Sequence, residues 1–167
     1  DVPYPWEFAG RESKIIYHAE LNSTMDEAKY LARKGCPEFT TVIAGRQTSG
    51  RGRLDRQWFS EEGGLYFTIV LRPDLPPVFS SRIGFLASLT LARLLNEIFK
   101  IEVRVKWPND LLVNERKICG MLSELEAEAD RVAFINMGIG LNVNNDPSPI
   151  EPTATSLKTI LGHNVSK

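Results

Sequence analysis

Hydrophobic and polar positions alternate along the first third of the chain in two different periods. The segment that begins NSTMDEA has helix start signals, with Ser23 or Thr24 as the cap, acidic residues in the first turn, and Gly35 at the far end. Segments rich in β-branched and aromatic residues predict strands on both sides of this helix. These predicted strands cover residues 14–20, 39–45 and 64–73.

A longer helix is predicted over residues 79–100, because apolar side chains recur there at i, i+3, i+4 and i+7. The stripe consists of Ile83, Leu86, Ala87, Leu91, Leu94, Leu95 and Ile98. Phe85 and Leu89 fall outside the stripe, so we expect this helix to be buried on more than one side.

After this helix the pattern returns to strands separated by short polar turns. The predicted strands cover residues 103–107, 111–113, 116–128 and 131–144. Consecutive strands without intervening helices favour antiparallel pairing over repeated βαβ units. The sequence therefore predicts an α+β fold, with a mixed, largely antiparallel sheet and flanking helices.

The last predicted strand has two unlike faces. Ile135, Met137, Ile139, Leu141 and Val143 lie on one face, and Asn136, Gly138, Gly140 and Asn142 alternate on the other. The apolar face is expected to be core. Glycine within a strand indicates a floor on which a ligand approaches the backbone, or else a bulge or a tight contact with another element.

Composition narrows the classes of function. The 167 residues fit a single domain over 1–167. The net charge of −1 provides no global field for nucleic acid or an anionic membrane, so any anion site must be local. Cys36 and Cys119 have no metal-type or redox-type spacing, which fits reduced thiols in the cytoplasm. We expect no signal peptide, and we expect charged residues to interrupt the apolar stretches short of a membrane span.

Local positive charge is concentrated in the loop SGRGRLDRQW at 49–58. Alone, such a loop is typical of a solvated hairpin tip or of a module that contacts single-stranded nucleic acid. Together with KWPNDLLV at 106–113 and RKICG at 116–120, it suits the joining of a carboxylate to the α-phosphate of a nucleotide. Both reactants are anions, so the protein must cancel their repulsion, align them and stabilise the transferred charge. The chain has no G-x-x-x-x-G-K-[ST] motif, which excludes a P-loop.

These segments resemble the motifs of biotin protein ligases. SGRGRLDRQW resembles their G-R-G-R-x-G-R-x-W loop, and KWPND, RKICGML and GIGLNVN resemble three further motifs in the same order. The resemblance implies the synthetase-like α+β fold shared with lipoate ligases and class II aminoacyl-tRNA synthetases. It also implies an enzyme that converts biotin and MgATP into biotinyl-5′-AMP, and then transfers biotin to a lysine of a biotin carboxyl carrier protein.

The resemblance implies a role for each matching residue. Hydrogen bonds to the ureido group of biotin are expected from Ser23, Thr24 and Gln47. Close approach of the backbone is expected at Gly50, Gly120 and Gly138. The carboxylate and the adenylate phosphate would contact Arg51 and Arg53. The nucleotide would be surrounded by Arg56, Trp58, Asn109 and Asn142. Asp110 would assist Mg²⁺ or the incoming lysine, and Lys117 would stabilise charge at the α-phosphoryl group; Lys117, Arg53 and Asp110 form the expected catalytic set.

The sequence departs from the family pattern in several places. Asp55 replaces a glycine within the arginine loop, where φ is expected to be positive, and Asn22 replaces the usual aspartate before Ser23. Neither an N-terminal helix-turn-helix nor a C-terminal SH3-like barrel is expected, so repression of transcription is not expected either. We expect no specific nucleic acid and no membrane as partners, and the resemblance allows a homodimer.

Two alternatives to the biotin ligase stay open on the sequence. One is a lipoate or octanoate ligase-like enzyme of the same fold. The other is a binding module in which the arginine loop and Trp58 grip single-stranded nucleic acid by phosphate contact and base stacking.

Overall fold

A seven-stranded sheet with one long and two short helices makes up the computed structural model, which describes residues 14–166. The elements in chain order are β1 (Ile15–Leu21), α1 (Thr24–Arg33), β2 (Thr41–Gln47), β3 (Leu65–Leu71), the 3₁₀ turn η1 (Pro77–Phe79), α2 (Ser80–Phe99), β4 (Arg104–Lys106), β5 (Asp110–Val113), β6 (Arg116–Glu128), β7 (Arg131–Leu141) and α3 (Leu157–Leu161). From β1 to β7 the strands and α-helices follow the predicted order, and the turn η1 and the helix α3 were not predicted.

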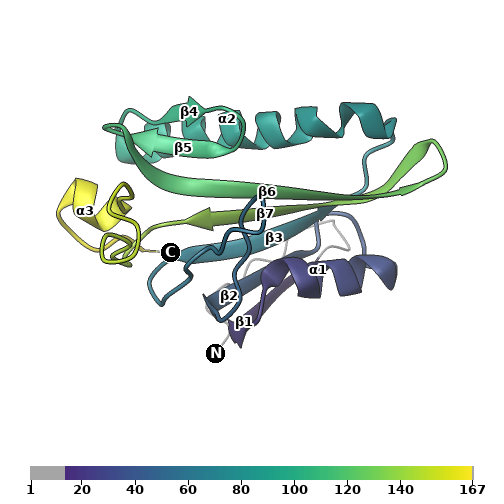
Figure 1. Cartoon of the computed structure of the whole chain (residues 1–167), viewed down its shortest axis with the longest axis horizontal. Helices are drawn as coiled ribbons and strands as arrows, with labels where there is room; N and C mark the ends of the chain where they lie inside the picture. The colour runs from purple at the N-terminus through teal and green to yellow at the C-terminus, as the bar shows by residue number, and fades with distance from the viewer. Residues whose placement is uncertain (1–13, 167) are drawn as a thin grey trace.

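The strands lie in the order β1-β2-β3-β7-β6-β5-β4. Only β1 and β2 pair in parallel, and the other neighbours are antiparallel. The predicted α+β class with a mixed, largely antiparallel sheet is therefore confirmed. Helices α1 and α2 cover opposite faces of this sheet (Figure 1). Strand β7 is central, paired with β3 on one side and β6 on the other, so both of its edges are hydrogen-bonded.

The larger core lies between the sheet and α2. Its buried members include Leu95, Leu111, Ile118, Met121, Met137 and Ile139. A smaller cluster beneath α1 consists of Ala28, Ala32, Val42, Val70 and Phe134. Cys119 is completely buried in the larger core, where burial raises the pKa of its thiol, and Cys36 is half-buried. Neither cysteine forms a disulfide.

The exposure of α2 contradicts our expectation that it is buried on more than one side. Phe85, Leu86, Leu94 and Ile98 are 50%, 59%, 46% and 64% exposed. The reason is that α2 lies as one layer on the sheet, so only one side of it meets β4 to β7. By length and composition alone the helix Pro77–Phe99 could cross a membrane, with a mean hydropathy of 1.4 in its most apolar window. We had not expected such a stretch, because Arg82 and Arg93 interrupt it.

Arg72, directly after β3, fixes the C-terminal end of α1. Its guanidinium donates to the carbonyls of Ala32 at 2.7 Å, Cys36 at 3.1 Å and Ala133 at 3.2 Å. A cation at a helix C-terminus also interacts favourably with the helix dipole. Because the other end of α1 carries Ser23 and Thr24, this anchor helps to set the position of predicted site residues.

We expect Arg72→Met to lower the free energy of unfolding by about 2–3 kcal/mol, because three carbonyls lose a charged donor. Urea unfolding followed by circular dichroism measures this change. Arg82→Met is the matched control, since Arg82 is exposed and lies over the Phe79 ring at 4.4 Å; it should cost less than about 0.5 kcal/mol. Equal effects of the two substitutions would contradict the anchoring role.

Candidate functional site

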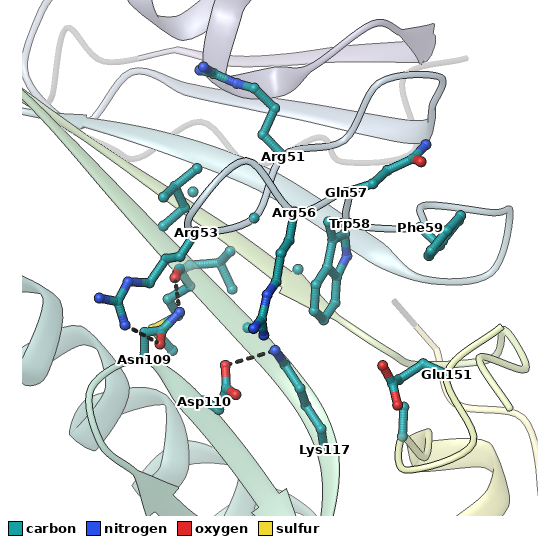
Figure 2. Close-up of a pocket in the computed structure, with 18 of the residues that line it drawn as sticks. Arg51, Arg53, Arg56, Gln57, Trp58, Phe59, Asn109, Asp110, Lys117 and Glu151 are labelled. Atoms are coloured by element: carbon teal, nitrogen blue, oxygen red, sulfur yellow. Dashed lines mark hydrogen bonds and ion pairs between the residues drawn. The ribbon is translucent and has the colours of Figure 1, made fainter.

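A cavity of about 380 Å³ lies where the N-terminus of α1, the loop at 49–58, and strands β6 and β7 meet (Figure 2). Every residue that the sequence nominated lines this cavity except Gly50. The lining members of that set are Ser23, Thr24, Gln47, Arg51, Arg53, Arg56, Trp58, Asn109, Asp110, Lys117, Gly120, Gly138 and Asn142. Gly50 belongs to an adjoining groove beneath the same loop. Side chains that are far apart in the sequence thus converge on one cavity.

The N-terminus of α1 forms a preorganised polar end. Ser23 caps the helix, its hydroxyl accepting a hydrogen bond from the Met25 amide. The carboxamide oxygen of Gln47 accepts from the Thr24 amide at 2.8 Å and from the Thr24 hydroxyl at 3.1 Å. Its nitrogen donates to Ser60 Oγ at 2.7 Å, and Thr24 Oγ1 lies 2.8 Å from Thr68 Oγ1. The three predicted ureido contacts are therefore held in place by one another and by the sheet.

The arginine loop at 49–58 is a small hairpin between β2 and β3. The Trp58 amide donates to the Gly50 carbonyl at 2.8 Å, and the Gly52 amide donates to the Arg56 carbonyl at 2.7 Å. At its tip, Leu54 and Asp55 have φ values of 54° and 58°. The expected positive φ at Asp55 is confirmed, and both residues carry the steric cost of the left-handed region.

The two predicted carboxylate-binding arginines point in different directions. Arg51 makes ion pairs with Asp26 at 3.1 Å and with Glu124 at 2.9 Å. Arg53 instead donates to Asn109 Oδ1 at 3.3 Å. Figure 2 shows the Arg51 guanidinium directed away from the Arg53 side chain. Arg51 and Arg53 could bind the same anion only if Arg51 broke its ion pairs with Asp26 and Glu124.

Lys117 and Asp110 form an ion pair at the opposite wall of the cavity. Their Nζ and Oδ1 atoms are 2.8 Å apart, and the side chains are 29% and 20% exposed. Pairing of β5 with β6 places Asp110 opposite Gly120, and a register shift between Leu111 and Leu112 lets Lys117 face the same cavity. The Lys117 ammonium lies 5.1 Å from the centre of the Trp58 ring, and Figure 2 shows Arg56 beside it.

The glycines of β6 and β7 make room for two side chains. A Cβ atom at Gly120 would lie 2.8 Å from Trp58 Cζ3, and one at Gly140 would collide with the Trp58 indole nitrogen. A Cβ at Gly138 would lie 2.5 Å from Met25 Sδ. This arrangement agrees with the alternative reading of the glycines, a tight contact with another element. A ligand that rests on these strands has to move Trp58 or Met25.

Sequence reasoning missed several residues that line the cavity. Met25 was read only as part of a helix, and the segment at 144–152 was read as the end of the regular pattern. In the structure Asn145, Asp146, Pro147, Ile150 and Glu151 line the cavity. The pKa of Glu151 is lowered, first by the hydrogen bond from the Thr153 hydroxyl and further by the charges of Lys117 and Arg56. This segment is held beside the cavity by an isolated parallel bridge between Lys117 and Ala154.

The fold is an α+β domain with a cavity lined by polar and cationic side chains. The chain belongs to the Biotin/lipoate A/B protein ligase family, whose sequence profile matches residues 18–142. The resemblance to biotin protein ligases is thus confirmed.

Individual relatives agree with this assignment. A bifunctional ligase/repressor BirA from Bacillus subtilis is 40% identical over 92% of this chain and 49% of its own length. A biotin–[acetyl-CoA-carboxylase] ligase from Paracoccus denitrificans is 34% identical over 86% of this chain and 61% of its own. The structure of an Aquifex aeolicus biotin protein ligase in complex with biotin and ATP matches with a TM-score of 0.75 and 35% identity, covering 92% of this chain and 63% of that one. The chain spans about half the length of the first of these relatives.

We expect Gly140→Ala to displace the Trp58 indole, because the added methyl group would overlap Trp58 Nε1. Trp58 fluorescence, recorded in a background with the other tryptophans changed to phenylalanine, should shift to longer wavelength as the indole meets water. Gly84→Ala is the control: its methyl would meet only Met137 Cε at 3.9 Å, and it should leave the spectrum unchanged while stabilising α2 by about 0.4–1 kcal/mol. An unchanged spectrum in Gly140→Ala would contradict the placement of Trp58.

Proposed function

We propose that this chain carries the catalytic centre of an ATP-dependent biotin–protein ligase. The observation that carries the proposal is the meeting of Arg53, Arg56, Lys117 and the polar N-terminus of α1 at one cavity. Cationic groups around one cavity suit two anionic reactants, and the hydrogen-bonding groups of α1 suit the polar end of an acyl substrate. The biotin- and ATP-bound relative of the same fold supports this choice of substrates.

In the proposed first step, a carboxylate oxygen of biotin attacks the α-phosphorus of ATP. An O–P bond forms, the bond to the bridging oxygen of the β-phosphate breaks, and pyrophosphate leaves with that electron pair. A carboxylate needs no general base, so the protein contributes alignment and charge stabilisation. Lys117 would neutralise the α-phosphoryl oxygens after it leaves Asp110. Arg53 would bind the carboxylate or the phosphate after it leaves Asn109.

In the proposed second step, the amine of an acceptor lysine attacks the carbonyl carbon of biotinyl-5′-AMP. An amide bond forms, the C–O bond to AMP breaks, and the amine loses a proton. Asp110, which holds Lys117, is the carboxylate best placed to accept that proton or to orient the amine. The acceptor is a lysine of a biotin carboxyl carrier protein, in keeping with the carboxylase ligases among the relatives.

Mg²⁺ is part of the proposal through ATP. Among residues 14–166 no group of three histidine, cysteine or acidic side chains is arranged around a metal position. A magnesium ion is commonly held by one or two carboxylates together with substrate phosphates, and Asp110 supplies one such carboxylate at the cavity. When bound, the ion would neutralise phosphate charge beside Lys117.

The rival readings have less support. A nucleic-acid module needs an exposed cationic stripe, whereas Arg53, Arg56 and Lys117 line one cavity together with the carboxylates of Asp110 and Glu151. A lipoate or octanoate ligase would use an apolar acyl pocket and would have little need for the hydrogen-bonded groups around Gln47.

We place the reaction in the cytoplasm, where both thiols stay reduced.

We expect Lys117→Ala to leave the affinity for biotin within a few-fold and to reduce adenylation by roughly 10² or more, because one preorganised charge partner is lost. Single-turnover formation of labelled biotinyl-AMP measures the rate, and calorimetry measures biotin affinity. Lys158→Ala, at an exposed position on α3, is the matched control and should keep the full rate. Unchanged adenylation in Lys117→Ala would remove this lysine from the mechanism.

We expect Asp55→Gly to slow dissociation of biotinyl-AMP, because the change removes a negative charge from the loop and relieves the positive φ of 58°. Leu54→Gly separates the two causes, since Leu54 has a φ of 54° and carries no charge. If charge dominates, only Asp55→Gly slows release; if backbone freedom dominates, both do. Stopped-flow release rates identical to the parent in both variants would rule out any effect of the loop tip on retention.

A further inference from the structure

The amide of Asn136 is buried without a hydrogen-bond partner. Asn136 has 0% exposure, and neither Oδ1 nor Nδ2 has a partner among the described residues. An unpaired buried polar group costs about 1–3 kcal/mol, so this side chain carries two such costs unless something else binds it. Its cross-strand neighbours are Val70 of β3 and Glu124 of β6.

Asn136 lies on the face of β7 that lines the cavity. Side chains two residues apart on a strand share a face, so Asn136 is followed on this face by Gly138 and Gly140, which both line the cavity. Two residues of strand span roughly 6–7 Å, which puts the Asn136 amide close to the floor at Gly138. Asn136 itself does not line the cavity in this conformation.

Met25 covers the strand between Asn136 and the open part of the cavity. Its sulfur sits directly over Gly138, and the side chain is 3% exposed while still lining the cavity. Methionine has three rotatable bonds and repacks at low cost. Rotation of Met25 away from Gly138 would extend the cavity toward the Asn136 amide without moving the backbone of α1.

The other polar groups at this end are already committed to one another. Both lone-pair positions of Gln47 Oε1 are used by Thr24, and Gln47 Nε2 donates to Ser60. Thr24 Oγ1 is shared with Thr68, and Ser23 Oγ caps α1. Asn136 differs from these groups, because its two N–H donors and its carbonyl acceptor have no hydrogen-bond partner among the described residues.

We propose that Asn136 is a substrate-recognition residue, which hydrogen-bonds the cyclic urea of the acyl substrate once Met25 has moved aside. A carboxamide presents a carbonyl and an N–H side by side, which is complementary to the carbonyl and N–H of a urea. An aliphatic acyl chain cannot satisfy it, so the buried amide also discriminates against acids without a polar head. This inference rests on the proposed function, because it assigns part of the acyl selectivity of the same cavity.

The test compares Asn136→Leu with the parent protein in calorimetric binding of biotin and of octanoate. Leucine has the same number of side-chain heavy atoms as asparagine, branches at the same carbon, and removes both unpaired polar atoms. We expect biotin binding to weaken by about tenfold or more, octanoate binding to stay equal or improve, and the melting temperature not to fall. Asn136→Ala carries the same test if the leucine variant does not fold.

Ser88→Ala is the matched control, since Ser88 is equally buried but packs against Met121 on the opposite face of the sheet. It should change neither affinity. If Asn136→Leu leaves biotin binding unchanged, or weakens biotin and octanoate by the same factor, the amide is a structural group or holds a buried water and the inference is wrong. If the parent protein binds no biotin, the proposed function itself fails.

Discussion

The two faces of the central strand β7 lie in different surroundings, one in the hydrophobic core and the other at the cavity. Its odd-numbered residues, such as Met137 and Ile139, fill the core beneath α2, and this fixes the register with β3 and β6. A slip of one residue would turn those side chains into the cavity and bring the polar face into the core. The bare, glycine-containing face is therefore held in place by hydrophobic burial on the far side of the sheet.

The bare face is occupied in this conformation by the protein's own side chains, and its cations are paired with its own acids. Arg51 is bound by Asp26 and Glu124, and Lys117 by Asp110. Because these side chains are between 20% and 58% exposed, water screens the pairs and each contributes little to stability. Weak pairs are suited to a site that receives anions, since a phosphate or carboxylate can replace the internal partner at small cost.

Much of this site could be predicted from the sequence, and the remainder depends on contacts that leave no local signal. The helix cap at Ser23 and the two unlike faces of β7 follow from local rules on capping and alternation, and the positive φ at Asp55 follows from the glycine that the family has at this position. The direction of Arg51 could not be predicted, because it depends on carboxylates of α1 and β6 that meet only in the fold. The exposure of α2 was missed for a similar reason, since periodicity identifies an apolar stripe but not what covers it.

The contacts of Trp58 imply that the arginine loop and the floor of the cavity move together. The Trp58 amide is hydrogen-bonded to the Gly50 carbonyl, so the indole and the arginines belong to one small hairpin. A substrate that rests on Gly140 displaces the indole, and the hairpin has to adjust around the same hydrogen bond. The same hairpin carries Arg51, which pairs with Glu124, and Arg53, which donates to Asn109. The contacts of Trp58 therefore join the floor of the cavity at Gly140 to the hairpin that carries the arginines.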